Sequence, residues 1–264
     1  MESDVNKAEY LIKKDRIIIY SAIFLIILIA WAYLFQLENE MKTMDMSIIN
    51  PMPSLEVWSF ATFLLMFVMW FVMMVAMMFP STAPTALVFA KVYRKRKKEG
   101  KPFVSLIIFL SGYLTIWAVF SLGATMLQLI LQKIAFLSSM MEITSPLLGA
   151  AILLAAGVFQ FTSLKNKCLT ECRNPMGFLV SEWRDGMYGA FLMGIRHGYF
   201  CVGCCWMLMV LLFVTGVMNL MWVAAIALFV LIEKVLPYPQ WTGRIAGLLL
   251  ILWGLMMLVR TSIF

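Results

Sequence analysis

Long apolar runs separated by short polar segments form the main pattern along the chain. Most runs have about 18 residues or more with few charges, the length that a helix needs to cross about 30 Å of hydrocarbon. Backbone groups in lipid must be satisfied within their own segment, so the runs are predicted to be helices. We predict an all-α, polytopic transmembrane helical bundle of about seven spans, with six as the alternative, in a single membrane domain. The predicted spans are residues 17–37, 58–79, 103–132, 146–164, 187–215, 218–236 and 243–260 of residues 1–264.

Charged residues between the runs indicate the orientation of the bundle. Lys and Arg gather before the first span and in the segments at 91–101 and 165–186, whereas four acidic residues and one Lys occupy the segment at 38–57. Because Lys and Arg favour cytoplasmic loops, we expect a cytoplasmic N-terminus and an external segment at 38–57. Pro80 and Pro84 are expected to end or kink the second span near the inner interface.

Composition supports a membrane protein and argues against several other classes. The chain is 63% hydrophobic and 13% charged, against about 45–50% and about 25% in soluble domains. The net charge of +7 lies mostly in the predicted cytoplasmic loops, so it does not indicate nucleic-acid binding. There is no Gly-rich phosphate loop, and the single His leaves no Ser/His/Asp set. We therefore assign no catalytic residues and favour a binding protein over an enzyme.

One face of the predicted span at 187–215 carries an unusual set of metal-binding side chains. They recur at spacings of three and four residues, which places them along one helical stripe. Thiolates and thioethers favour Cu(I), and with an imidazole they would also serve Zn(II). Cys and Met can instead be simple packing residues, but three Cys beside the only His favour a metal or redox role. The stripe contains Met193, His197, Cys201, Cys204, Cys205 and Met209.

Three further groups of sulfur residues lie elsewhere in the chain. The second span carries a methionine stripe, which is either packing or a facing set of thioether ligands. The external segment carries methionines that could capture Cu(I), and the cytoplasmic segment carries a C-x3-C pair whose basic neighbours favour thiolate. Taken from the external segment through the span to the cytoplasmic segment, the three groups describe a path across the membrane. They are Met69, Met73 and Met77 in the span, Met41, Met44 and Met46 outside, and Cys168 and Cys172 inside.

Two of the charged residues within the predicted spans can be compared in depth. Arg196 and Glu233 come to similar depths if the last spans form a tight hairpin near residue 217. Ionisable groups inside a membrane usually face the bundle interior, so a pair between them is one expectation and snorkelling to the interface is the other. If it faces inward, Glu233 could instead orient His197 as a hydrogen-bond acceptor.

At these residues the chain resembles an uncharacterised prokaryotic family of predicted metal-binding integral membrane proteins. The resemblance extends from about residue 58 to 254 and implies a multi-span fold, metal binding and a place in the prokaryotic cell membrane. It implies no particular reaction. The GCCW-plus-Met run is its most specific part. The matching segments are MMVAMMFPSTAP (73–84), CLTECRNP (168–175), HGYFCVGCCWMLM (197–209), GVMNLMW (216–222) and EK (233–234).

The leading functional interpretation is an integral membrane protein that binds a soft metal for transport or delivery. Copper(I) is the expected metal and zinc is the other candidate. Two alternatives stay open: a membrane thiol–disulfide protein, since Cys201 and Cys204 have a C-x2-C spacing, and a non-catalytic accessory subunit of a membrane metalloenzyme complex. Expected partners are the lipid bilayer, the metal ion, and either other membrane subunits or a second copy of this chain.

Overall fold

The fold is helical throughout the part of the chain that the computed structural model describes, which comprises residues 2–47, 59–98, 105–134, 136–137, 143–236 and 238–263. Within these ranges an isolated β-bridge joins Leu137 to Ile143, and every other regular element is a helix. The prediction of an all-α fold is therefore confirmed. The helices are α1 (Glu2–Ser47), α2 (Phe60–Lys98), α3 (Leu106–Lys133), α4 (Pro146–Phe159), α5 (Ser163–Arg173), α6 (Pro175–Ser181), α7 (Gly186–Val210), α8 (Leu212–Thr215), α9 (Leu220–Val235) and α10 (Pro239–Ile263).

Several of these helices are long and apolar enough to cross a membrane. Five segments qualify within the described ranges, and the bent pair of α4 and α5 would make a sixth. Helix α9 has 16 residues, and the predicted total of about seven spans stays a prediction, as does the cytoplasmic N-terminus. The five segments are Ile17–Glu40, Phe60–Arg94, Leu106–Lys133, Gly186–Thr215 and Gln240–Thr261.

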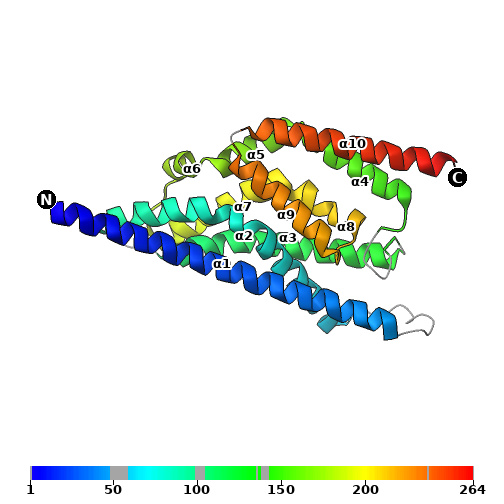
Figure 1. The fold of residues 1–264 in the computed structure, drawn as a ribbon, viewed down its shortest axis with the longest axis horizontal. Helices are drawn as coiled ribbons and strands as arrows, with labels where there is room; N and C mark the ends of the chain where they lie inside the picture. The colour runs from blue at the N-terminus through cyan, green and yellow to red at the C-terminus, as the bar shows by residue number, and fades with distance from the viewer. Residues whose placement is uncertain are drawn as a thin grey trace.

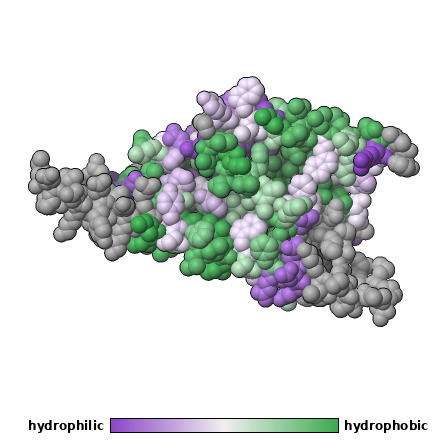
Figure 2. All heavy atoms as spheres, in the orientation of Figure 1, coloured by the Kyte–Doolittle hydropathy of each residue, from purple (hydrophilic) through white to green (hydrophobic). Residues whose placement is uncertain are grey.

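The outer surface agrees with a lipid environment. Large apolar side chains are exposed along α1, as at Phe24 and Ile29, and along α10, as at Leu249 and Met256. Figure 2 shows apolar residues over much of the face in view, with the strongly hydrophilic residues toward its edges. In water such a surface would expose large apolar patches, whereas in hydrocarbon it needs no further cover.

Helix α7 lies at the centre of the contacts that build the site. It packs along α3, while α1 packs along α2 and α4 along α10 (Figure 1). Helix α2 also contacts α3 and α9, and α5 contacts both α7 and α9. Side chains from α2, α5, α7 and α9 can therefore meet in one place.

Two glycines allow α3 and α7 to approach with their backbones almost in contact. A Cβ on Gly112 of α3 would lie 2.2 Å from the carbonyl oxygen of Phe191, and one on Gly194 of α7 would lie 2.0 Å from that of Phe109. Small residues at helix interfaces are how membrane helices gain packing contact without a hydrophobic driving force. This contact fixes the rotation of α7, and hence the direction in which its cysteines point.

The structure corrects the predicted ends of two spans. Helix α2 continues through Pro80 and Pro84 to Lys98, so these prolines do not end it. Side chains add hydrogen bonds in the turn around Pro80, because the Ser81 hydroxyl and the Tyr113 hydroxyl both donate to the carbonyl oxygen of Met78, at 2.7 and 3.2 Å. The carbonyl that Pro80 leaves without a helical partner is that of Ala76, so these two bonds reinforce the turn and do not replace the bond that is lost.

The segment predicted as an external loop at 38–57 also begins as helix. Helix α1 extends to Ser47, so the loop prediction is wrong for residues 38–47, and residues 48–58 lie outside the described ranges. The predicted tight turn after residue 215 is present. Gly216 has a φ of 86° and ends α8, a conformation that glycine adopts without strain.

Candidate metal site

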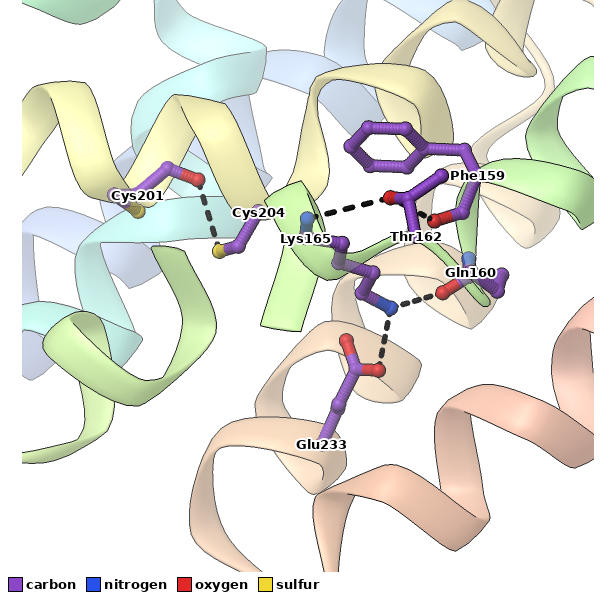
Figure 3. Close-up of polar contacts among 7 residues, drawn as sticks. All are labelled: Phe159, Gln160, Thr162, Lys165, Cys201, Cys204 and Glu233. Carbon is purple, nitrogen blue, oxygen red and sulfur yellow. Dashed lines mark hydrogen bonds and ion pairs between the residues drawn. The ribbon is translucent and has the colours of Figure 1, made fainter. Parts of the chain in front are cut away.

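Three thiols lie on one buried face of α7. Cys201, Cys204 and Cys205 each have an exposed fraction of 1% or less, as expected for one helical stripe. The thiols of Cys204 and Cys205 donate hydrogen bonds to the carbonyl oxygen of Cys201, at 3.1 and 2.8 Å. Figure 3 shows the bond from Cys204. The three sulfur atoms therefore belong to a single turn of α7.

A fourth thiol comes from α5. Cys172 is buried in the same apolar core as Cys201 and Cys204 and lies close enough to interact with both thiols, although it is distant from them in sequence. One turn earlier, Cys168 packs against α7 at Gly203, where an added Cβ would lie 2.8 Å from its sulfur. The C-x3-C pair is thus not a separate site: α5 lays it against the α7 cysteines. All five cysteines of the chain are buried free thiols.

A bend in the chain brings α5 to this place. The axes of α4 and α5 differ by 62°. This bend falls near the end of the span predicted at 146–164, which stays a prediction. Helix α4 ends at Phe159, and the Thr162 hydroxyl oxygen accepts a hydrogen bond from the backbone amide of Lys165 to begin α5. The Asn174 side chain likewise caps α6 by accepting from the amide of Gly177. Both caps are local signals that can be read in the sequence.

Helix α2 places a thioether sulfur beside the four cysteine thiols. The Cys205 thiol donates to the sulfur of Met78 at 3.8 Å. Met78 is adjacent in sequence to Met77 of the predicted stripe, and both are buried in the same core. We call these five residues the sulfur cluster: Cys172, Cys201, Cys204, Cys205 and Met78.

The methionines that the sequence singled out have different surroundings. Met69, Met73 and Met77 are buried in the same apolar core as the cysteines, and so is Met209. Met193 belongs instead to a second core with aromatic residues from α2, α3 and α6. A ligand role for these methionines stays a prediction, and so does the capture role of the outer set, whose side chains lie outside the described part: Met41, Met44 and Met46.

A lysine ammonium and two hydroxyls also reach the cluster. Lys234 of α9 donates from its Nζ to the sulfur of Cys201 and to the hydroxyl oxygen of Ser81, both at 3.0 Å. The Tyr113 hydroxyl of α3 lies 3.2 Å from the same Cys201 sulfur. The sequence analysis missed these three residues. Lys234 could have been found, since an ionisable residue inside an apolar span is a candidate functional residue.

The single histidine lies one helical turn from Cys201 and has an aromatic environment. Its ring centroid is 5.3 Å from that of Phe178, 5.7 Å from Tyr113 and 6.0 Å from Phe109. Both ring nitrogens of His197 are buried without a hydrogen-bond partner. A buried imidazole nitrogen without a partner is costly, and a metal ion would satisfy it. The His197 ring makes no hydrogen bond to a thiol. Its predicted role as a metal ligand therefore stays a prediction.

The predicted ion pair between Arg196 and Glu233 is wrong. Glu233 pairs with Lys165 of α5, at 2.5 Å between Nζ and Oε1, and the same Nζ donates to the side-chain oxygen of Gln160 (Figure 3). Arg196 pairs with Glu182 near the surface. The alternative role of Glu233 as an acceptor for His197 is also contradicted, since that ring has no hydrogen-bond partner. The bend before α5 is the cause, because it carries Lys165 into the bundle.

The cluster is not arranged as a ready-made site for a multi-ligand metal. Across the described ranges, no group of three or more His, Cys, Asp or Glu side chains converges as metal ligands would. The thiols of Cys204 and Cys205 point to a backbone carbonyl oxygen, and the Lys234 ammonium contacts the sulfur of Cys201. Tetrahedral zinc needs four converging ligands. Thiolate and thioether donors instead favour a soft ion such as Cu(I).

Comparison with known families gives this arrangement a context. A family model described as PpoB2, copper chaperone, matches residues 67–257. The chain belongs to this copper chaperone family. The match covers α2 through most of α10, including every residue of the sulfur cluster, and it supports the copper association expected from the thiols. No curated protein and no solved structure matches the chain.

Proposed function

We propose that this protein is a membrane-embedded copper chaperone that holds Cu(I) as cargo at the sulfur cluster and delivers it to a partner protein. The observation that carries the proposal is the meeting of four free thiols and one thioether, from three helices, in the buried core. Thiolate and thioether sulfur are the ligands that select Cu(I) over harder ions. The family description supports delivery over other uses of bound metal.

The core ligands in this proposal are Cys201, Cys204 and Cys172, which contact one another across α5 and α7. Cys205 and Met78 extend the sulfur surface toward α2. Burial excludes water and oxidants from the ion, which favours retention of the cuprous state. The two unpartnered nitrogens of His197 offer a further donor within one turn of Cys201.

The metal content of protein purified anaerobically in mild detergent tests this function. Wild type is compared by elemental mass spectrometry with the Cys201/Cys204/Cys205 triple Ala variant. Met207→Leu is the matched control, because it changes a partly buried sulfur residue of the same helix that lies outside both the predicted stripe and the sulfur cluster. We expect near-stoichiometric copper in wild type and in the control, and loss of copper in the triple variant. Equal copper in all three proteins would contradict the proposal.

Contact between thiols of α5 and α7 also favours a second candidate, reversible disulfide formation between Cys172 and Cys201 or Cys204. Such a step would remove two electrons and two protons from the thiols and pass them to an oxidant such as a membrane quinone. Mass spectrometry after alkylation, without reductant, distinguishes the two functions. A loss of two alkylation sites without bound copper would favour the redox candidate.

A further inference from the structure

Lys234 places a fixed positive charge inside the sulfur cluster. Its Nζ lies 3.0 Å from the Cys201 sulfur, and it interacts electrostatically with the other three cysteines of the cluster. The neighbouring carboxylate is engaged elsewhere, because Glu233 pairs with Lys165 of α5. The consecutive residues of this Glu-Lys pair thus have separate environments.

Helix α5 fixes the position of Lys234. The Arg173 guanidinium donates to the carbonyl oxygen of Lys234 at 3.1 Å and also to that of Leu236. These bonds satisfy carbonyls that the end of α9 leaves without helical partners. The ion pair with Lys165 holds Glu233, the residue that precedes Lys234. The backbone that carries the ammonium is therefore held on both sides, and Ser81 of α2 holds its tip.

We propose that Lys234 makes the sulfur cluster selective for monovalent soft cations, so that Cu(I) enters and Zn(II) is excluded. This inference rests on the proposed function, because it assigns a selectivity to the same site. Repulsion between the ammonium and a bound ion scales with the charge of the ion, and is therefore twice as large for Zn(II) as for Cu(I). Soft thiol ligands alone do not make this distinction, since they also bind zinc.

Coulomb's law sets the size of the effect. One additional unit charge at about 4 Å, with an effective dielectric constant of about 20, corresponds to a factor of about 1,000 in the binding constant. The ammonium can turn partly away when an ion binds, so the measured effect is smaller. We expect a change of about 100-fold in the ratio of the two affinities when the charge is removed.

The experiment measures Cu(I) and Zn(II) binding to the full-length protein, reduced and anaerobic in mild detergent, with buffered free ions and elemental mass spectrometry. Lys234→Met removes the charge and keeps the length of the side chain. Lys234→Gln keeps a hydrogen-bond donor and supplies a second neutral variant in case the first does not fold. Lys234→Arg keeps the charge. Lys167→Met is the matched control, because it removes an exposed charge from α5.

Wild type, Lys234→Arg and Lys167→Met are expected to keep a high ratio of Cu(I) to Zn(II) affinity, and the neutral variants are expected to lower it by about 100-fold. A change below about 3-fold in both neutral variants, or an equal change in Lys167→Met, overturns the inference while the proposed function stands. If wild type binds no Cu(I), the selectivity inference and the proposed function both fail. The metal content of wild type and of the Cys201/Cys204/Cys205 triple Ala variant reports that outcome separately.

Discussion

The buried ion pair between Lys165 and Glu233 allows a quantitative test of how the site is held together. Their exposed fractions are 1% and 2%, so water cannot replace a lost partner. Lys165→Met leaves the carboxylate of Glu233 against the Gly243 backbone, where an added Cβ would lie only 2.9 Å from its oxygen. Glu233→Gln leaves the ammonium buried with neutral amide oxygens as partners, that of Gln160 included, and without a counter-charge.

Removing one partner of a buried pair typically costs about 3–5 kcal/mol, because the other charge stays buried without compensation. Each single variant should therefore lose about 3 kcal/mol or more of the free energy of unfolding. The double variant Lys165→Met/Glu233→Met leaves no unpaired charge and should recover most of that loss. Since α5 carries Cys172, the single variants should also bind copper more weakly.

Denaturant titration in mixed micelles, followed by tryptophan fluorescence, measures these free energies. The control is Arg196→Met, which breaks the pair with Glu182; Arg196 is 47% exposed, so the expected loss is within about 1 kcal/mol. The reasoning would be refuted if Lys165→Met cost no more than Arg196→Met. It would also be refuted if the double variant were less stable than either single variant.

Two further predictions concern the helix contacts around the cluster. Gly194→Val should prevent α3 and α7 from packing, because the new Cβ would lie 2.0 Å from the carbonyl oxygen of Phe109. We expect the free energy of unfolding to fall by about 3 kcal/mol or more and copper binding to be lost. An unchanged free energy of unfolding would contradict this. Met78→Leu should preserve the fold, since the volumes are similar, but weaken Cu(I) binding by removing the thioether beside Cys205, and a competition titration with a Cu(I) chelator that gave equal affinities would exclude Met78 as a ligand.

The part of the site on α7 could be predicted from the sequence because it depends only on helical spacing. Cys201, Cys204 and Cys205 share a face wherever the helix packs, and an apolar run of this length is helical in any bundle. The glycines of α3 and α7 then decide that this face is buried. Burial of the three thiols therefore follows from local pattern together with small residues at the interface.

The rest of the site depends on how helices distant in sequence are placed, which spacing does not reveal. Cys172 joins the cluster because the chain bends between α4 and α5, whereas the sequence predicts a cytoplasmic segment at 165–186 for this residue. Met78 contacts the Cys205 thiol, and spacing alone does not distinguish it from its neighbour Met77, because the two differ in direction by about 100° and the orientation of α2 depends on its packing.

The Glu-Lys pair on α9 illustrates why the chemistry of the site required the structure. In sequence, Glu233 and Lys234 are adjacent opposite charges that could neutralise each other. In the bundle, two cations of α5 act on them: Lys165 pairs with Glu233, and Arg173 binds the carbonyl oxygen of Lys234. With its carboxylate neighbour engaged, Lys234 extends to the Cys201 sulfur. The charge at the sulfur cluster is therefore a consequence of the bend that places α5 against α9, and the same bend supplies Cys172.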